Sequence, residues 1–233
     1  MNLRILTPPH WAVARSLLKW SRKLKIPLVK GYQPVDVVIV IGNGVPDNIM
    51  CMILAHKLNG TRIIGLTKPE RSLSGTFHEL AFHTRVRKIV VILDQEDRNL
   101  DEVWRYLETE LRRAGIKINI VNSEPRLCIY SCSYGNHLFE VIAVINGLEM
   151  PYRKHTIEDH LLKICEELCG SKLSQMLGTR SVDPKEMWNR LRNMHFEVYS
   201  YILKANISKL EEIFHYHIKA LKLVLEETEQ RTR

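Results

Sequence analysis

Three acidic side chains follow directly on the most apolar segment of the chain. Residues 89–93 are five consecutive apolar residues, four of them β-branched, and this predicts a strand buried on both faces. Asp94, Glu96 and Asp97 come next, and a helical pattern begins at Asn99. Ligands of open α/β sheets bind beyond the carboxyl ends of the strands, and carboxylate oxygens suit Mg²⁺ and Mn²⁺. The segment therefore predicts a metal site; the alternative is acids that only stabilise a helix start.

A glycine turn ends an earlier apolar run. Residues 35–41 are apolar except for one acid and predict a buried strand, which Gly42, Asn43 and Gly44 follow before a helix that starts near Pro46. A turn of this kind can bind phosphate. The third glycine of a dinucleotide fingerprint and the lysine of a P-loop are both missing, so the pattern favours a structural turn that lines a cleft. Nucleotide binding is the alternative.

A second acidic segment lies further along the chain. Thr156 is a typical helix cap, and it places Glu158 and Asp159 in the first turn of a helix, directly after Lys154 and His155. Acids at this position can act as capping residues and nothing more. The functional interpretation is that a second carboxylate reaches the cluster that follows the residue 89–93 strand.

Composition and charge bound the classes of protein. The 233 residues are 45% hydrophobic and 26% charged, as in an ordinary globular protein. No apolar run approaches the roughly 18 residues of a membrane span, and no signal peptide is visible, so we expect a cytoplasmic protein without membrane contact. The net charge of +8 and the pI of about 9.3 fit a polyanionic partner such as nucleic acid.

The five cysteines raise the question of zinc. Cys128 and Cys132 are four residues apart, as are Cys165 and Cys169, a spacing that zinc sites permit. Both pairs lie in apolar segments, where free cysteine behaves as a small hydrophobe, and disulfides are not expected in a cytoplasmic chain. A Cys₄ zinc site is the less favoured alternative.

Strand and helix patterns alternate along the first half of the chain. We expect strands at residues 3–6, 35–41, 61–66, 88–93, 117–121, 127–131 and 138–145, and helices at residues 9–25, 46–57, 77–83, 99–114 and 156–169. Residues 138–145 also allow a helix. The alternation predicts an α/β fold, a mainly parallel sheet with helices on both faces. We divide the chain into residues 1–34, a strand and helix joined to the core, residues 35–169, the α/β core, and residues 170–233, a C-terminal helical segment with a break near residue 206.

Three motifs together resemble the Toprim domain, the metal-binding fold of topoisomerases, bacterial primases and overcoming-lysogenization-defect nucleases. Residues 37–47 stand where the family has a strand, a Glu-Gly turn and a helix; residues 94–97 (Asp-Gln-Glu-Asp) stand at its Asp-x-Asp motif; residues 157–162 are similar to an Ile-Glu-(Asp/Asn)-x-Leu-Leu helix start in some relatives. The resemblance covers roughly residues 35–165 and is greatest to small archaeal Toprim-related proteins. It implies Mg²⁺ or Mn²⁺ as cofactor and nucleic acid as partner.

One departure from the family bears on activity. The glutamate that acts as general acid or base in the family should lie at the first turn, where this chain has Gly42 and Asn43. An asparagine amide cannot shuttle a proton at neutral pH. The resemblance therefore implies catalytic and metal-binding roles for Asp94 and Glu96, and it implies further residues at the same edge: Asp97 and Glu158 for the metal, and Asn43, Gly44, Arg98, Lys154 and His155 for substrate.

The sequence leaves three hypotheses for function. The first is a Toprim-related protein that binds or acts on nucleic acid phosphates with Mg²⁺, as a nuclease or phosphotransferase of low activity. The second is a non-enzymatic interaction protein, or a homodimer formed through the C-terminal helices. The third is a regulatory module that binds a small nucleotide at residues 42–44. The first requires Asp47, Asp94, Glu96 and Glu158 to converge in one cleft.

Overall fold

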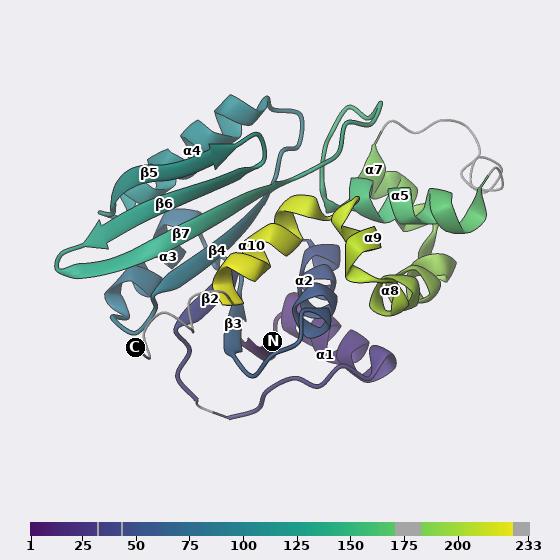
Figure 1. The fold of residues 1–233 in the computed structure, drawn as a ribbon, viewed down its shortest axis with the longest axis horizontal. Coiled ribbons are helices and arrows are strands. Elements are labelled where there is room, and N and C mark those ends of the chain that lie inside the picture. The colour runs from purple at the N-terminus through teal and green to yellow at the C-terminus, as the bar shows by residue number, and fades with distance from the viewer. Residues whose placement is uncertain (32, 43, 171–182, 226–233) are drawn as a thin grey trace.

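A single seven-stranded sheet forms the centre of the molecule (Figure 1). The computed structural model describes residues 1–225 except 32, 43 and 171–182. Its strands are β1 (Asn2–Ile5), β2 (Val37–Val40), β3 (Ile63–Thr67), β4 (Lys88–Asp94), β5 (Lys117–Glu124), β6 (Leu127–Tyr134) and β7 (His137–Asn146). They lie in the order β1-β3-β2-β4-β7-β6-β5, in which the neighbours from β1 to β7 pair in parallel and β6 and β5 are added antiparallel. The predicted fold class, α/β with a mainly parallel sheet, is confirmed.

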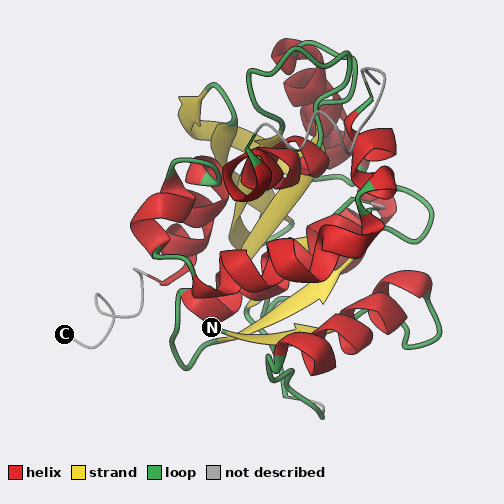
Figure 2. Cartoon of the chain, turned by 90° about the vertical axis from the view of Figure 1, so that its right-hand side faces the viewer, coloured by secondary structure: helices red, strands yellow, loops and turns green. Residues whose placement is uncertain are grey.

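Helices cover both faces of this sheet, as Figure 2 shows. The described helices are α1 (Ala12–Leu24), α2 (Val45–Lys57), α3 (Leu73–Phe82), α4 (Leu100–Arg113), α5 (Ile157–Cys169), α7 (Pro184–Arg190), α8 (His195–Lys204), α9 (Ile207–Glu211) and α10 (His215–Leu225), with a 3₁₀ turn η1 (Arg192–Met194). α3 and α4 pack on one face, and α1, α2, α5 and α10 pack on the other, where α8 packs against α2 and α5.

The central strands are apolar throughout because both of their faces are covered. In β2, Val38 and Val40 contact the α3 and α4 side, while Val37 and Ile39 contact the side of α1 and α2. This division follows from the two-residue repeat of a strand. Asp94 continues the alternation at the end of β4, so its side chain belongs to the α2 and α5 face.

The chain after residue 183 packs on the same core as the preceding elements. α10 crosses the face of the sheet over β4 and β7 (Figure 1), and its Ile218, Leu221 and Val224 are buried. β1, from the other end of the chain, pairs with β3. The break predicted near residue 206 lies between α8 and α9.

Several predicted elements differ in detail from those observed. The helical alternative for residues 138–145 is wrong, because β7 pairs with β4 and β6 along its length. The buried side of α1 consists of Val13, Ala14, Leu17, Ser21 and Leu24; Trp11 and Leu18, expected on that side, are only partly buried. Trp11 precedes the helix rather than belonging to it, so the helical periodicity does not extend to it. No helix within the described residues is long and apolar enough to span a membrane.

Candidate functional site

Two adjacent parallel strands place an acid and an amide side by side. β4 ends at Asp94 and β7 at Asn146, and these residues are partners in the strand register. The Asn146 side-chain nitrogen donates to Asp94 Oδ1 at 2.9 Å and to Asp47 Oδ1 at 2.8 Å. Asp47 comes from the first turn of α2, after the glycine turn that follows β2. One amide therefore connects two carboxyl groups at the carboxyl edge of the sheet.

Gly44 explains how Asp47 reaches this position. A Cβ atom at residue 44 would lie 2.1 Å from Asp47 Oδ2, closer than two such atoms can approach. Gly44 is also the N-cap of α2, in extended backbone conformation. The glycine of the predicted phosphate turn thus makes room for a buried carboxyl group of the same chain.

His217 of α10 completes this hydrogen-bond chain. Its Nε2 lies 2.7 Å from Asn146 Oδ1. Because the Asn146 nitrogen serves two carboxyl groups, its oxygen faces His217, and Nε2 must carry the proton of the neutral ring. Burial, with His160 and Arg126 nearby, holds the pKa of His217 well below its ordinary value.

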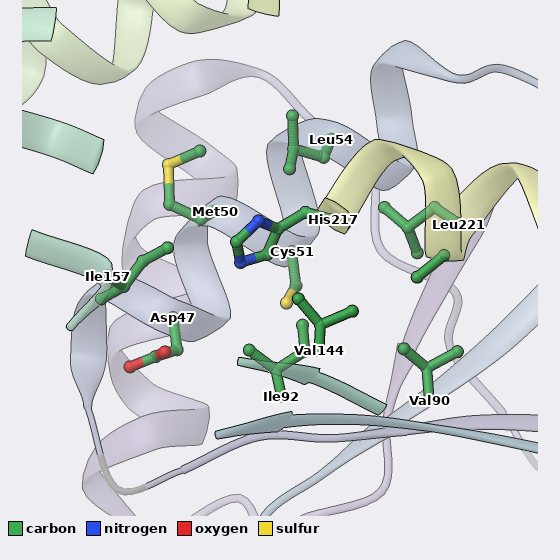
Figure 3. Close-up of a pocket in the computed structure, with 11 residues that line it drawn as sticks. Asp47, Met50, Cys51, Leu54, Val90, Ile92, Val144, Ile157, His217 and Leu221 are labelled. Atoms are coloured by element: carbon green, nitrogen blue, oxygen red, sulfur yellow. The ribbon is translucent and has the colours of Figure 1, made fainter. Parts of the chain in front are cut away.

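A small cavity lies between these hydrogen-bonded polar side chains and the apolar core. Its volume is about 10 Å³, which is at the lower limit for one water molecule. Figure 3 shows Asp47 and Ile157 at one end of it, Val90 and Leu221 at the other, and His217 between them. The cavity marks the border between the polar cluster and the packing of α2 and α10 on the sheet.

The second predicted acid, Glu158, approaches from α5. The backbone N–H of Ile157, in the first turn of α5, donates to Asp94 Oδ1 at 3.3 Å. Glu158 is the next residue and is 6% exposed. Its Oε2 and the Oδ2 of Asp47 are buried, and neither has a hydrogen-bond partner among the residues that the structure describes. We call Asp47, Asp94 and Glu158 the carboxyl cluster.

Electrostatics of the carboxyl cluster follow from its burial. Burial raises the pKa of Asp47 well above its ordinary value, and the charges of Asp94 and Glu158 raise it further. Burial raises the pKa of Glu158 to about 7, with Asp94 adding to the effect. Burial also raises the pKa of Asp94, although Asn146 and Lys185 act in the opposite direction. Three carboxyl groups that oppose one another's ionisation would be stabilised by a cation.

A lysine from α7 lies against the acids at the end of β4. Lys185 Nζ lies 2.5 Å from Glu96 Oε1 and 3.6 Å from Asp94 Oδ2. Burial lowers the pKa of Lys185, but Glu96 and Asp94 outweigh it and raise that pKa above its usual value. Glu96 itself has a positive φ of 57° and exchanges backbone hydrogen bonds with His155. The loop after β4 is therefore joined to the segment before α5.

The remaining predicted site residues lie around the cluster. Asp97 is exposed. Arg98 lies over the Tyr106 ring at 5.2 Å, and its guanidinium donates to the Asp94 carbonyl. Lys154 pairs with Asp183 at 3.7 Å. His155 pairs with Asp159 at 3.0 Å. Asn43 lies outside the described residues.

The described side chains at this edge do not form a complete set of metal ligands in the observed arrangement. Among the residues that the structure describes, no three His, Cys, Asp or Glu side chains form a group that could hold a metal ion. The two cysteine pairs cannot combine, because Cys128 and Cys132 pack on the α3 and α4 face while Cys165 and Cys169 pack on the opposite one. The carboxyl cluster would have to rearrange around an ion.

Three residues of the site were not predicted from the sequence. Asn146 ends a strand like many asparagines, and only its register with Asp94 shows its role. His217 lies 71 residues further along the chain, on a helix whose contact with the sheet no local pattern indicates. Lys185 is one of many lysines. Of the three, Asn146 alone had a local signal, because a polar residue that directly follows an apolar strand can lie at the ligand-binding edge of a sheet.

Comparison of the chain with protein-family models, with curated protein sequences and with solved structures found no match.

Proposed function

We propose that this protein binds a divalent cation, Mg²⁺ or Mn²⁺, at the carboxyl cluster and uses it to bind nucleic acid phosphates, as a Toprim-related protein of low or no catalytic activity. The observation that carries the proposal is the convergence of Asp47, Asp94 and Glu158 from α2, β4 and α5. A non-enzymatic interaction protein would not need these carboxyl groups to meet in a buried position.

The donor set fits a hard cation. Asp47 Oδ2 and Glu158 Oε2 are buried oxygens without partners among the described residues, and such atoms normally cost free energy unless something bonds to them. Mg²⁺ and Mn²⁺ take oxygen ligands and often keep several waters, so two or three carboxylates suffice. Asp94, Glu96 and Glu158 would hold the ion, with Glu96 contributed by the loop after β4. The bound ion would neutralise charge on a phosphate oxygen.

Two cations near the cluster would contact the remaining phosphates of a nucleic acid strand. Arg98 and Lys154 flank the two acidic segments, Arg98 over the Tyr106 ring and Lys154 beside Asp183. The lysines of α10 lie against other acids, Lys219 against Glu124 and Lys222 against Glu211. Since phosphate contacts release counterions, binding through Arg98 and Lys154 should weaken steeply with salt. The turn offers Asn43 in place of the family's acid–base glutamate, so we expect cleavage to be slow or absent.

Titration calorimetry with Mn²⁺ tests the metal. Wild type should bind, Asp94→Asn should lose at least tenfold in affinity because a charged ligand is removed, and the exposed Asp101→Asn should match wild type. Equal heats for wild type and Asp94→Asn would refute the metal site.

Filter binding of oligonucleotides over a salt series tests the phosphate partner. Arg98→Ala and Lys154→Ala should each weaken binding and reduce its salt slope by about one, while Lys219→Ala should leave both unchanged. Equal losses for all three would mean that charge acts diffusely rather than at the proposed site.

A further inference from the structure

Lys185 makes a contact that differs in kind from an ordinary surface ion pair. Its ammonium is 2.5 Å from Glu96 and 3.6 Å from Asp94, and it also attracts the charge of Glu158. One positive charge thus faces three acids. A surface pair of the same length, between Lys219 and Glu124, joins one cation to one acid.

The helix that carries Lys185 is anchored independently of this contact. Asp183 caps α7, and its carboxylate accepts from the backbone N–H groups of Lys185 and Glu186. Trp188 of α7 is 3% exposed and stacks on His195. The long side chain of Lys185, 39% exposed, can therefore turn away from the acids without unfolding α7.

We propose that the Lys185 ammonium occupies the place that a divalent cation would take between Asp94 and Glu96, so that the lysine and the ion exclude each other. This inference rests on the proposed function, since it concerns the same acids. It accounts for two observations together: the carboxyl groups converge, yet the described residues present no ready group of metal ligands. Lys185 is thus an internal competitor that sets how much free cation is needed to load the site.

Mn²⁺ affinity of lysine variants tests the competition. Lys185→Met keeps an unbranched side chain about as long as the lysine's aliphatic part and removes the charge. It should bind Mn²⁺ about three- to tenfold more tightly than wild type, the effect of an ion pair near a protein surface. Lys185→Arg should bind no more tightly than wild type. Lys219→Met is the matched control, because that lysine is 40% exposed and its ion pair is also 2.5 Å long; it should not change the affinity.

Amine labelling measures the displacement of Lys185 directly. Wild-type protein is treated briefly with acetic anhydride at increasing Mg²⁺, and acetylation is quantified by mass spectrometry. Acetylation of Lys185 should rise severalfold as Mg²⁺ saturates the site, while that of Lys219 in the same sample stays constant. Unchanged Lys185 labelling at saturating Mg²⁺ would overturn the proposal.

The outcomes separate this inference from the function on which it rests. If wild type and Lys185→Met bind Mn²⁺ equally, the competition is refuted and the metal site stands. If only Lys185→Met binds, the competition is supported and the wild-type protein is blocked. If neither binds, both proposals are wrong, because acids freed of their lysine should bind the ion.

Discussion

The two edges of the sheet differ in how their acidic and basic side chains are paired. At the amino edge of β4, Lys88 is 4% exposed, pairs with Glu140 at 3.3 Å and donates to the carbonyl of Leu223. Arg62 and Asp36 form a second pair near the start of β2, at 2.5 Å. At the carboxyl edge, one lysine faces several acids, and two buried carboxyl oxygens have no hydrogen-bond partner among the described residues. Acids and bases are therefore balanced at the amino edge, whereas acids outnumber bases at the carboxyl edge.

Loss of the amino-edge pair should have the largest effect on stability. Lys88→Met removes the ammonium and leaves Glu140 and the Leu223 carbonyl without it, so the free energy of unfolding should fall by about 2 kcal/mol. Because the Glu140 side chain is 38% exposed, water can solvate it and the loss stays below that of a fully buried pair. Urea denaturation measures it. An unchanged midpoint would show that this edge contributes no more than an exposed ion pair.

Titration of Glu158 should make stability depend on pH in the direction opposite to that of an ordinary ion-paired carboxylate. Its pKa rises to about 7 from an ordinary value of 4.5, so the folded protein holds this proton more firmly than the unfolded chain does. The free energy of unfolding should therefore fall between about pH 4.5 and pH 7, by on the order of 1–2 kcal/mol from this group. Glu158→Gln should flatten that part of the profile, measured by urea denaturation at several pH values. If the pH profile of Glu158→Gln were the same as that of wild type, the burial of Glu158 would have no effect on its titration.

Removal of one acid from the carboxyl edge should stabilise the protein slightly. Asp94→Asn keeps an oxygen for the Asn146 amide and the Ile157 N–H and removes a charge that Asp47 and Glu158 oppose. We expect a gain of about 1 kcal/mol at pH 8, partly offset by the lost attraction to Lys185. Thermal unfolding without metal measures it. A clear loss of stability would mean that Asp94 is stabilised by its cationic and hydrogen-bonding partners as well as the acids at the amino edge are by theirs.

The strands were predictable from the sequence because most of them are local apolar runs separated by helical patterns. The end of β4 and the start of α5 were predictable as well, since Asp94 and Glu158 follow directly on such patterns. The partners of these acids were not predictable. His217 and Lys185 reach the site because distant helices pack there, and no local sequence pattern indicates that packing. The boundary of α1 was missed for a simpler reason: Trp11 fits the helical repeat but lies before the helix begins.

The bond between Asn146 and His217 has a consequence for biosynthesis. Its two residues are 71 positions apart, and a ribosome adding about 5–20 residues per second needs roughly 4–14 s to pass from one to the other. During that interval β7 can pair with β4, and the Asn146 amide nitrogen can already donate to Asp47 and Asp94. The Asn146 oxygen has no His217 to bond until α10 has been synthesised. The sheet can thus form on the nascent chain several seconds before α10 arrives to seal the polar end of it.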